Sequence, residues 1–287
     1  MTFPADAPVI DTMIAFPQKD TARYDFIRAQ TKDTASKEEM EFPAEYMFKE
    51  VPKDLPTDDP IGVTLREMDR YNIERGLISV GDEVSRLALE RYPDRFAASG
   101  TIDPNTGMDG IRRMVREYEE FGIRAVGVFP AGTFPQVAIN DKKMYPFYAK
   151  CVELDIPIFV CAGVPGPRLR MEPQRVELID EVMFDFPELV MVTRHGCEPW
   201  TDLAVKLMLK WPGLHYSTSA FAPRYYPQAI IDYANSRGAD KVLYGGYFPM
   251  GLSLERIFTD MPRVPFHDEV WPKFLYGNAS RLLKLDR

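Results

Sequence analysis

The chain has 287 residues, of which 45% are hydrophobic and 27% are charged, a balance typical of a globular protein and unlike a disordered or membrane-spanning one. Its formal net charge of −8 argues against a nucleic-acid partner, because binding of that kind needs a basic face. The three cysteines are irregularly spaced and form neither a disulfide framework nor a paired zinc motif.

No apolar stretch approaches the roughly 20 residues that a membrane span requires. The first residues lack the basic and apolar pattern of a signal peptide. Together with the unpaired cysteines, these features predict a cytoplasmic protein in a reducing compartment, without a membrane partner.

Short apolar, β-branched runs alternate with amphipathic segments along the chain, which is typical of a parallel sheet wrapped by helices. Eight strands are predicted, at 9–15, 76–81, 96–102, 125–130, 158–162, 190–195, 214–218 and 241–247. Among the helices, the apolar spacing predicts 109–121, 174–184 and 200–210. Because a (β/α)8 barrel needs about 250 residues, we expect a single barrel domain over residues 1–287.

The segment 16–60, after the first predicted strand, is long, charged and rich in proline and aromatic residues. It leaves from the carboxyl end of a strand, where the active sites of barrels lie, and long connections usually have a function. We interpret it as a lid over a pocket. The same aromatic residues would equally suit a contact between the subunits of a homodimer.

Residues at the ends of different strands meet at one mouth of a barrel. Asp11 and Met13 lie at the end of the first predicted strand, and Cys161, His195 and Tyr247 end the fifth, sixth and eighth. Neighbouring strands are about 4.8 Å apart, so Cys161 and His195 could come within hydrogen-bonding distance.

The chain resembles the amidohydrolase-related family that includes aminocarboxymuconate-semialdehyde decarboxylase and the benzoate-type decarboxylases. The resemblance covers nearly the whole chain. It rests on five segments in order: Val-Ile-Asp at 9–11, Ile-Pro-Ile-Phe-Val-Cys-Ala-Gly at 156–163, Val-Thr-Arg-His-Gly at 192–196, Leu-Tyr-Gly-Gly-Tyr-Phe-Pro at 243–249 and Gly-Asn-Ala-Ser-Arg-Leu-Leu at 277–283. It implies a metal-binding (β/α)8 barrel.

The resemblance also implies where a metal would bind. The family holds it with a His-x-His pair on strand one, a His on strand five and an Asp on strand eight, and these positions carry Met13, Ala15, Cys161 and Tyr247 here. Methionine is a weak ligand, alanine is none and a phenol is a poor one, so only Cys161 would bind zinc well. We therefore expect neither a metal nor another cofactor.

His195 is the leading catalytic candidate. The resemblance matches it to the family's strand-six histidine, which acts beside the metal as an acid or base, and histidine suits proton transfer near pH 7. Alternatively, it is a buried histidine bonded to a neighbouring carbonyl. Cys161 could be a thiolate nucleophile that His195 activates, or a small residue filling the space of a lost ligand.

Tyr247 and Asp11 complete the catalytic candidates. Tyr247 could donate a proton or stabilise an oxyanion, or its ring could plug the vacated metal pocket beside Met13. Asp11 could orient His195 or a substrate hydroxyl group, or be a structural carboxylate bonded to loop amides. His215 is interpreted as structural, as is His267 in a late loop.

Four further residues are substrate-binding candidates, with Met13. Arg168 lies in a proline-stiffened loop after the fifth strand and could bind a carboxylate through two hydrogen bonds, or be a solvated surface residue. Arg194 and Glu198 flank His195, and Glu198 could instead cap the next helix. Trp200 is one of several aromatic residues near the mouth that indicate an apolar cavity, or core packing.

These features predict an enzyme of the amidohydrolase superfamily that needs no metal. It would hydrolyse or cleave a small organic acid, ring or lactone-like substrate, with His195 as the general acid/base. One alternative is a metal-dependent hydrolase or decarboxylase with a site remodelled from Asp11, Cys161 and His195. Another is a non-catalytic ligand-binding barrel, expected if Met13 and Tyr247 fill the mouth and no cavity reaches His195.

Overall fold

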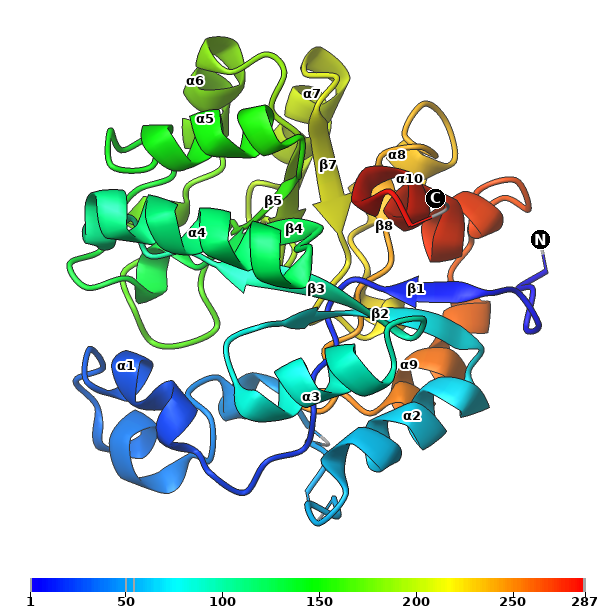
Figure 1. Ribbon diagram of the computed structural model, residues 1–287. Coiled ribbons are helices and arrows are strands. Elements are labelled where there is room, and N and C mark those ends of the chain that lie inside the picture. Colours follow the sequence, from blue (N-terminus) through cyan, green and yellow to red (C-terminus); the bar gives the residue numbers. More distant parts are fainter. Residues whose placement is uncertain (1, 50, 54, 286–287) are drawn as a thin grey trace.

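The computed structural model describes residues 2–49, 51–53 and 55–285. Eight parallel strands follow one another in chain order around one curled sheet, so the predicted (β/α)8 barrel is confirmed (Figure 1). The strands are β1 Val9–Asp11, β2 Ile73–Ser79, β3 Phe96–Thr101, β4 Ala125–Val128, β5 Ile158–Cys161, β6 Met191–Arg194, β7 Leu214–Ser217 and β8 Val242–Leu243.

The α-helices surround this sheet, and Figure 1 shows α4 and α5 lying on its outer side. Their bounds are α1 Asp25–Arg28, α2 Pro60–Arg70, α3 Glu83–Arg91, α4 Gly107–Phe121, α5 Tyr145–Leu154, α6 Leu178–Asp185, α7 Thr201–Lys210, α8 Gln228–Ala234, α9 Leu254–Asp260 and α10 Asn278–Leu283. Helix α4 ends at Gly122, whose φ of 59° is the left-handed conformation that glycine tolerates. Of the predicted helix 174–184, the part from Leu178 onward is α-helical.

The first and last strands are shorter than predicted because the chain leaves the ladder soon after each begins. The barrel is closed instead by the residues that follow these strands. The Thr12 amide and hydroxyl both donate to the Tyr244 carbonyl, at 3.4 and 2.7 Å. The Ala15 amide donates to the Phe248 carbonyl at 2.9 Å.

Apolar side chains fill the amino-terminal half of the barrel. Seven strands each contribute one member of a buried inner cluster: Ile10, Leu77, Ala97, Ala125, Phe159, Val192 and Leu243. Leu282 and Leu283 of α10 pack against the same cluster and plug that end. The carboxyl-terminal mouth is therefore the end at which a ligand can enter.

The segment 16–60 contains short helical pieces rather than a structureless loop. They are η1 Ala22–Tyr24, α1, η2 Ala35–Glu39 and η3 Glu45–Met47. Figure 1 shows this blue segment beside the open end of the sheet, away from both termini.

Cys151, Cys161 and Cys197 are buried free thiols. Among the residues that the structure describes, no helix has both the length and the apolar character needed to cross a membrane.

Candidate active site

A cavity of about 1050 Å³ opens at the carboxyl-terminal mouth of the barrel. Strand-end loops form one side, and the segment 16–60 forms the other with residues that include Tyr24, Phe42 and Phe48. Of the predicted site residues, the cavity is lined by Met13, Cys161, Arg194, His195, Glu198 and Tyr247. Asp11, Arg168 and Trp200 do not line it.

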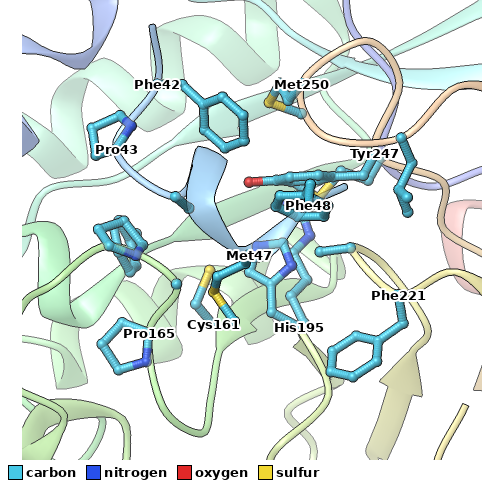
Figure 2. Close-up of a pocket in the computed structure, with 18 of the residues that line it drawn as sticks. Phe42, Pro43, Met47, Phe48, Cys161, Pro165, His195, Phe221, Tyr247 and Met250 are labelled. Carbon is cyan, nitrogen blue, oxygen red and sulfur yellow. The ribbon is translucent and has the colours of Figure 1, made fainter. Parts of the chain in front are cut away.

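His195 and Tyr247 lie against each other at the cavity wall (Figure 2). Their ring centroids are 5.4 Å apart in an edge-to-face arrangement. Phe48, from the segment 16–60, stacks on Tyr247 at 5.6 Å. Figure 2 shows the Tyr247 hydroxyl pointing into the cavity, so the ring lines the mouth without filling it.

Ser219 holds the imidazole of His195. The His195 amide donates to the Ser219 hydroxyl at 3.3 Å, and the same hydroxyl lies 3.3 Å from Nδ1. Within the described part of the chain, Nε2 has no hydrogen-bond partner. Burial, and next the positive charge of Arg194, lower the His195 pKa to about 4. The ring is therefore neutral at pH 7, where Nε2 or Nδ1 can accept a proton but the ring holds none to donate as an imidazolium.

Cys161 is a buried thiol. Burial raises its pKa to about 11, and the charge of Arg194 offsets only part of this effect. No hydrogen bond joins Cys161 to His195 in the described residues. Because the thiolate is the nucleophilic form, these observations favour the interpretation of Cys161 as a small buried residue.

Asp11 lies where the first and last strands of the barrel meet, and its carboxyl group bonds to the loops that follow both strands. Its Oδ1 accepts hydrogen bonds from the amides of Met13 and Gly246, both at 2.8 Å. The carboxyl group is fully buried, and burial raises its pKa to about 7 against the opposing effect of these two hydrogen bonds. Asp11 therefore ties the loop after β1 to the loop after β8, as a structural carboxylate would.

The remaining predicted substrate ligands differ in their positions. Arg168 forms an ion pair with Asp33 and covers the Tyr46 ring at 4.6 Å, so it joins the loop after β5 to the segment 16–60. Trp200 precedes α7 and packs against the barrel core. Glu198 is exposed and lines the cavity.

Sequence reasoning missed the conformational strain at this mouth. Four of the non-glycine residues in the left-handed region lie in the loops after β6, β7 and β8: His195, Cys197, Ala220 and Tyr247, with φ of 66°, 58°, 67° and 143°. Strained backbone of this kind gathers at functional sites. Sequence reasoning also missed Ser219. Its position two residues after the end of β7, at the same mouth as His195, could have indicated a role there.

The cavity also carries a positive charge that the composition conceals. Among the residues that the structure describes, the basic side chains of its lining are Arg23, Lys49, Arg194, Arg224 and Arg256, and the acidic one is Glu198. The formal charge of these described lining residues is thus 5 − 1 = +4, against −8 for the chain. Asp260, behind the wall, pairs with Arg224 and Arg256 at 3.7 and 3.0 Å. A pocket of this sign attracts anions.

The side chains present do not fit the metal that the resemblance implies. Among the described residues, no group of three or more His, Cys, Asp or Glu side chains is placed to hold an ion. Asp11 is bonded to two loop amides, and Ala15 has no donor in its side chain. The remodelled trio of Asp11, Cys161 and His195 is therefore not assembled as a ligand set.

The comparisons agree with this architecture. The amidohydrolase family model matches residues 11–285, so the chain belongs to the amidohydrolase family. No curated protein matches the chain.

Three solved structures illustrate the shared fold. An uncharacterized TIM-barrel protein of Bordetella bronchiseptica is 24% identical, with a TM-score of 0.74, and the match covers 97% of this chain and 99% of that one. A dihydroxybenzoic acid decarboxylase of Polaromonas, with bound manganese and the inhibitor 2-nitroresorcinol, is 17% identical, with a TM-score of 0.66 and 98% of each chain covered. A 4-oxalomesaconate hydratase of Rhodopseudomonas palustris is 17% identical, with a TM-score of 0.59 and 96% of each chain covered.

Proposed function

We propose that this protein is an enzyme that hydrolyses or cleaves a small organic acid, and that it does so without a bound metal. The observation that carries this proposal is a large, mainly apolar cavity with a positively charged lining that reaches a neutral histidine and a tyrosine hydroxyl. A mouth filled by Met13 and Tyr247 would have favoured the alternative of a non-catalytic barrel, but both residues line an open cavity.

The comparisons support the substrate class. By their names, two of the similar structures belong to proteins that act on carboxylic acids, dihydroxybenzoic acid and 4-oxalomesaconate. An organic anion of that size would be drawn to a lining whose described residues include five basic side chains and one acidic side chain. Aromatic lining residues such as Phe42 and Phe129 would contact its apolar part.

In this proposal, His195 is the base and Tyr247 is the hydrogen-bond donor. For a lactone or ester, His195 accepts one proton of a water molecule as the water oxygen bonds to the carbonyl carbon. The Tyr247 hydroxyl, whose pKa is raised by burial, keeps its proton and donates a hydrogen bond to the oxyanion. The bond from the carbonyl carbon to the leaving oxygen then breaks, and that oxygen takes the proton from His195.

Substitution of His195 tests the chemistry. We expect His195→Asn to lower turnover of carboxylate-bearing lactones and related acids by about 10²- to 10⁴-fold, with an unchanged circular dichroism spectrum. Ser219→Ala, which removes the support of the ring and leaves the ring itself, should have a smaller effect. Turnover by His195→Asn equal to that of the wild type would refute the role of His195.

Elemental analysis tests the metal independence. Protein purified without added metal should contain no stoichiometric zinc, manganese or iron, and chelator treatment should leave its turnover unchanged. One equivalent of any of these metals, lost together with activity on chelation, would establish the metal-dependent alternative instead.

A further inference from the structure

The side chain of Arg194 lies inside the barrel rather than at its rim. Val192 belongs to the inner cluster, and Arg194, two residues later on β6, points the same way because side chains alternate along a strand. Its guanidinium lies over the Phe159 ring, with 4.5 Å from Cζ to the centroid. Arg194 therefore forms the layer directly above the apolar plug and faces the cavity that it helps to line.

The missing side chain of Gly127 leaves room for this guanidinium. A Cβ atom at Gly127 on β4 would lie 3.1 Å from Nη1 of Arg194. Across the barrel, Nη2 donates to the Thr12 carbonyl at 3.3 Å. The planar group thus spans from β4 to the end of β1, and its Nε atom is buried without a hydrogen-bond partner among the described residues.

The guanidinium also lies among the positions to which the resemblance assigns the metal. Arg194 interacts electrostatically with Cys161 on β5, with Tyr247 after β8 and with Asp11 on β1. Cys161 is also its register partner across the β5–β6 ladder. By the resemblance, these elements are the ones that would surround a metal, and here the thiol of Cys161, the phenol of Tyr247 and the buried carboxyl group of Asp11 surround a permanent organic cation.

We propose that the guanidinium of Arg194 is the resident cation of this barrel and takes the place of the metal. The guanidinium receives the carboxylate of a ligand in the cavity, or an oxyanion that forms on that ligand during the reaction. The inference rests on the proposed function only for the claim that this ligand is a substrate. Anion binding by Arg194 holds whether or not turnover follows.

This replacement changes what the rest of the site must do. A bound metal both attracts anions and acidifies water, whereas a guanidinium supplies charge and planar donors but generates no hydroxide. A separate base is then required, and it must stay unprotonated near the cation. His195, adjacent to Arg194 in the chain and neutral at pH 7, meets that requirement.

Calorimetric titration of chelator-treated protein tests the proposal. The probes are benzoate, phthalate and cinnamate, with benzamide as the uncharged control. We expect the wild type to bind at least one carboxylate, and Arg194→Met to bind it about 30-fold or more weakly, because a buried charged partner is lost. Arg194→Lys, which keeps the charge without the planar donors, should fall between the two. Benzamide binding should change by less than the carboxylate binding in both variants.

Two further variants make the test specific. Gly127→Ala places a methyl group against Nη1 and should weaken carboxylate binding while the arginine is retained. Arg112→Met removes an exposed arginine of α4 that does not line the cavity, and it should leave carboxylate binding unchanged. If Arg194→Met fails to fold, the carboxylate affinities of Arg194→Lys and Gly127→Ala are compared with that of the wild type instead.

Three results would overturn the inference: carboxylate affinity in the foldable Arg194 variants equal to that of the wild type, no carboxylate binding by the wild type, or stoichiometric binding of Zn²⁺ or Mn²⁺ by the wild type. The proposed function is separable from this, since His195→Asn should keep carboxylate binding while it loses turnover. A His195→Asn variant with full turnover would contradict the proposed base and leave Arg194 as the anion site.

Discussion

Backbone conformation distinguishes two alanines of the loop after β7. Ala220 has a φ of 67°, in the left-handed region, whereas Ala222 has a φ of −66° and a ψ of 138°. The cost of the left-handed conformation comes from the Cβ atom, which glycine lacks. The two positions therefore offer a matched test of strain beside His195.

We expect Ala220→Gly to stabilise the protein by up to about 1 kcal/mol, because the Cβ clash is relieved. Ala222→Gly should instead destabilise it by about 0.5–1 kcal/mol through the added freedom of the unfolded chain. Urea unfolding of both variants provides the measurement. A loss of stability in Ala220→Gly as large as that in Ala222→Gly would contradict the strain at position 220.

The buried carboxyl group of Asp11 makes stability depend on pH. Its pKa is about 7 in the folded protein and near the ordinary value of 3.8 when unfolded, so the folded state holds the proton more tightly. This contribution to stability is fully present below pH 3.8 and is lost as the pH rises toward 7. The neutral His195 acts in the opposite direction, since its lowered pKa removes stability as the pH falls from 6.5 toward 4.

Asp11→Asn isolates the first effect. Its side-chain oxygen can still accept from the Met13 and Gly246 amides, but the side chain cannot ionise. We expect the free energy of unfolding of Asp11→Asn, relative to the wild type, to increase between pH 4 and pH 8. Chemical denaturation across that range measures it. A constant difference between the two proteins would show that Asp11 has the same pKa in both states.

At the scale of elements, the segment 16–60 is fastened to the barrel by a few polar contacts. Arg168 pairs with Asp33, the Tyr46 hydroxyl donates to the Gly166 carbonyl at 2.7 Å, and the Gln30 amide donates to the Gly132 carbonyl at 2.8 Å. Exposed contacts of this kind are individually weak, although the segment is also held by the stacking of Phe48 on Tyr247. We interpret the segment as a lid that opens when these contacts break.

We expect Arg168→Ala to increase amide hydrogen exchange in residues 21–49 while leaving exchange in the strands unchanged. The reason is that one substitution removes both the ion pair with Asp33 and the contact with the Tyr46 ring. Arg112→Ala, which breaks the exposed pair with Asp109 on α4, is the matched control and should leave the segment unaffected. Equal exchange in the wild type and Arg168→Ala would argue that the segment is a fixed wall.

At the scale of the whole molecule, exposed aromatic residues gather near the mouth. Phe26 and Phe134 are 54% and 78% exposed, and both line a second, smaller cavity beside the first. Exposed apolar surface of this kind marks contact sites in other proteins. It supports the prediction that the protein is a homodimer.

We expect sedimentation analysis to find a dimer in the wild type and a dissociation constant at least about tenfold weaker in the double variant Phe26→Ser, Phe134→Ser. Phe184→Ser is the matched control, because Phe184 is 74% exposed on α6. A monomeric wild type at micromolar concentration would refute the homodimer. A dimer disrupted only by Phe184→Ser would place the interface on the other face.

The alternation of apolar runs and amphipathic segments was enough to predict eight strands and the barrel. The reason is that strands covered by helices consist of short apolar runs, which can be recognised locally in the sequence. The same pattern predicted that Met13, Cys161, His195 and Tyr247 lie at one mouth of the barrel, because the carboxyl ends of parallel strands lie on the same side. Their distances and the unfilled cavity between them depend on packing.

The protonation state and the surroundings of the site residues could be determined only from the tertiary structure. The low pKa of His195, the inward direction of Arg194 and the room provided by Gly127 arise from strands that are distant in the sequence. The early ends of β1 and β8 likewise follow from a closure made by Thr12 and Tyr244, which no local pattern encodes. The protonation state, burial and direction of a side chain depend on neighbours from several strands, so they follow only from the assembled barrel. The spacing of apolar residues, in contrast, can be recognised within each segment of the sequence.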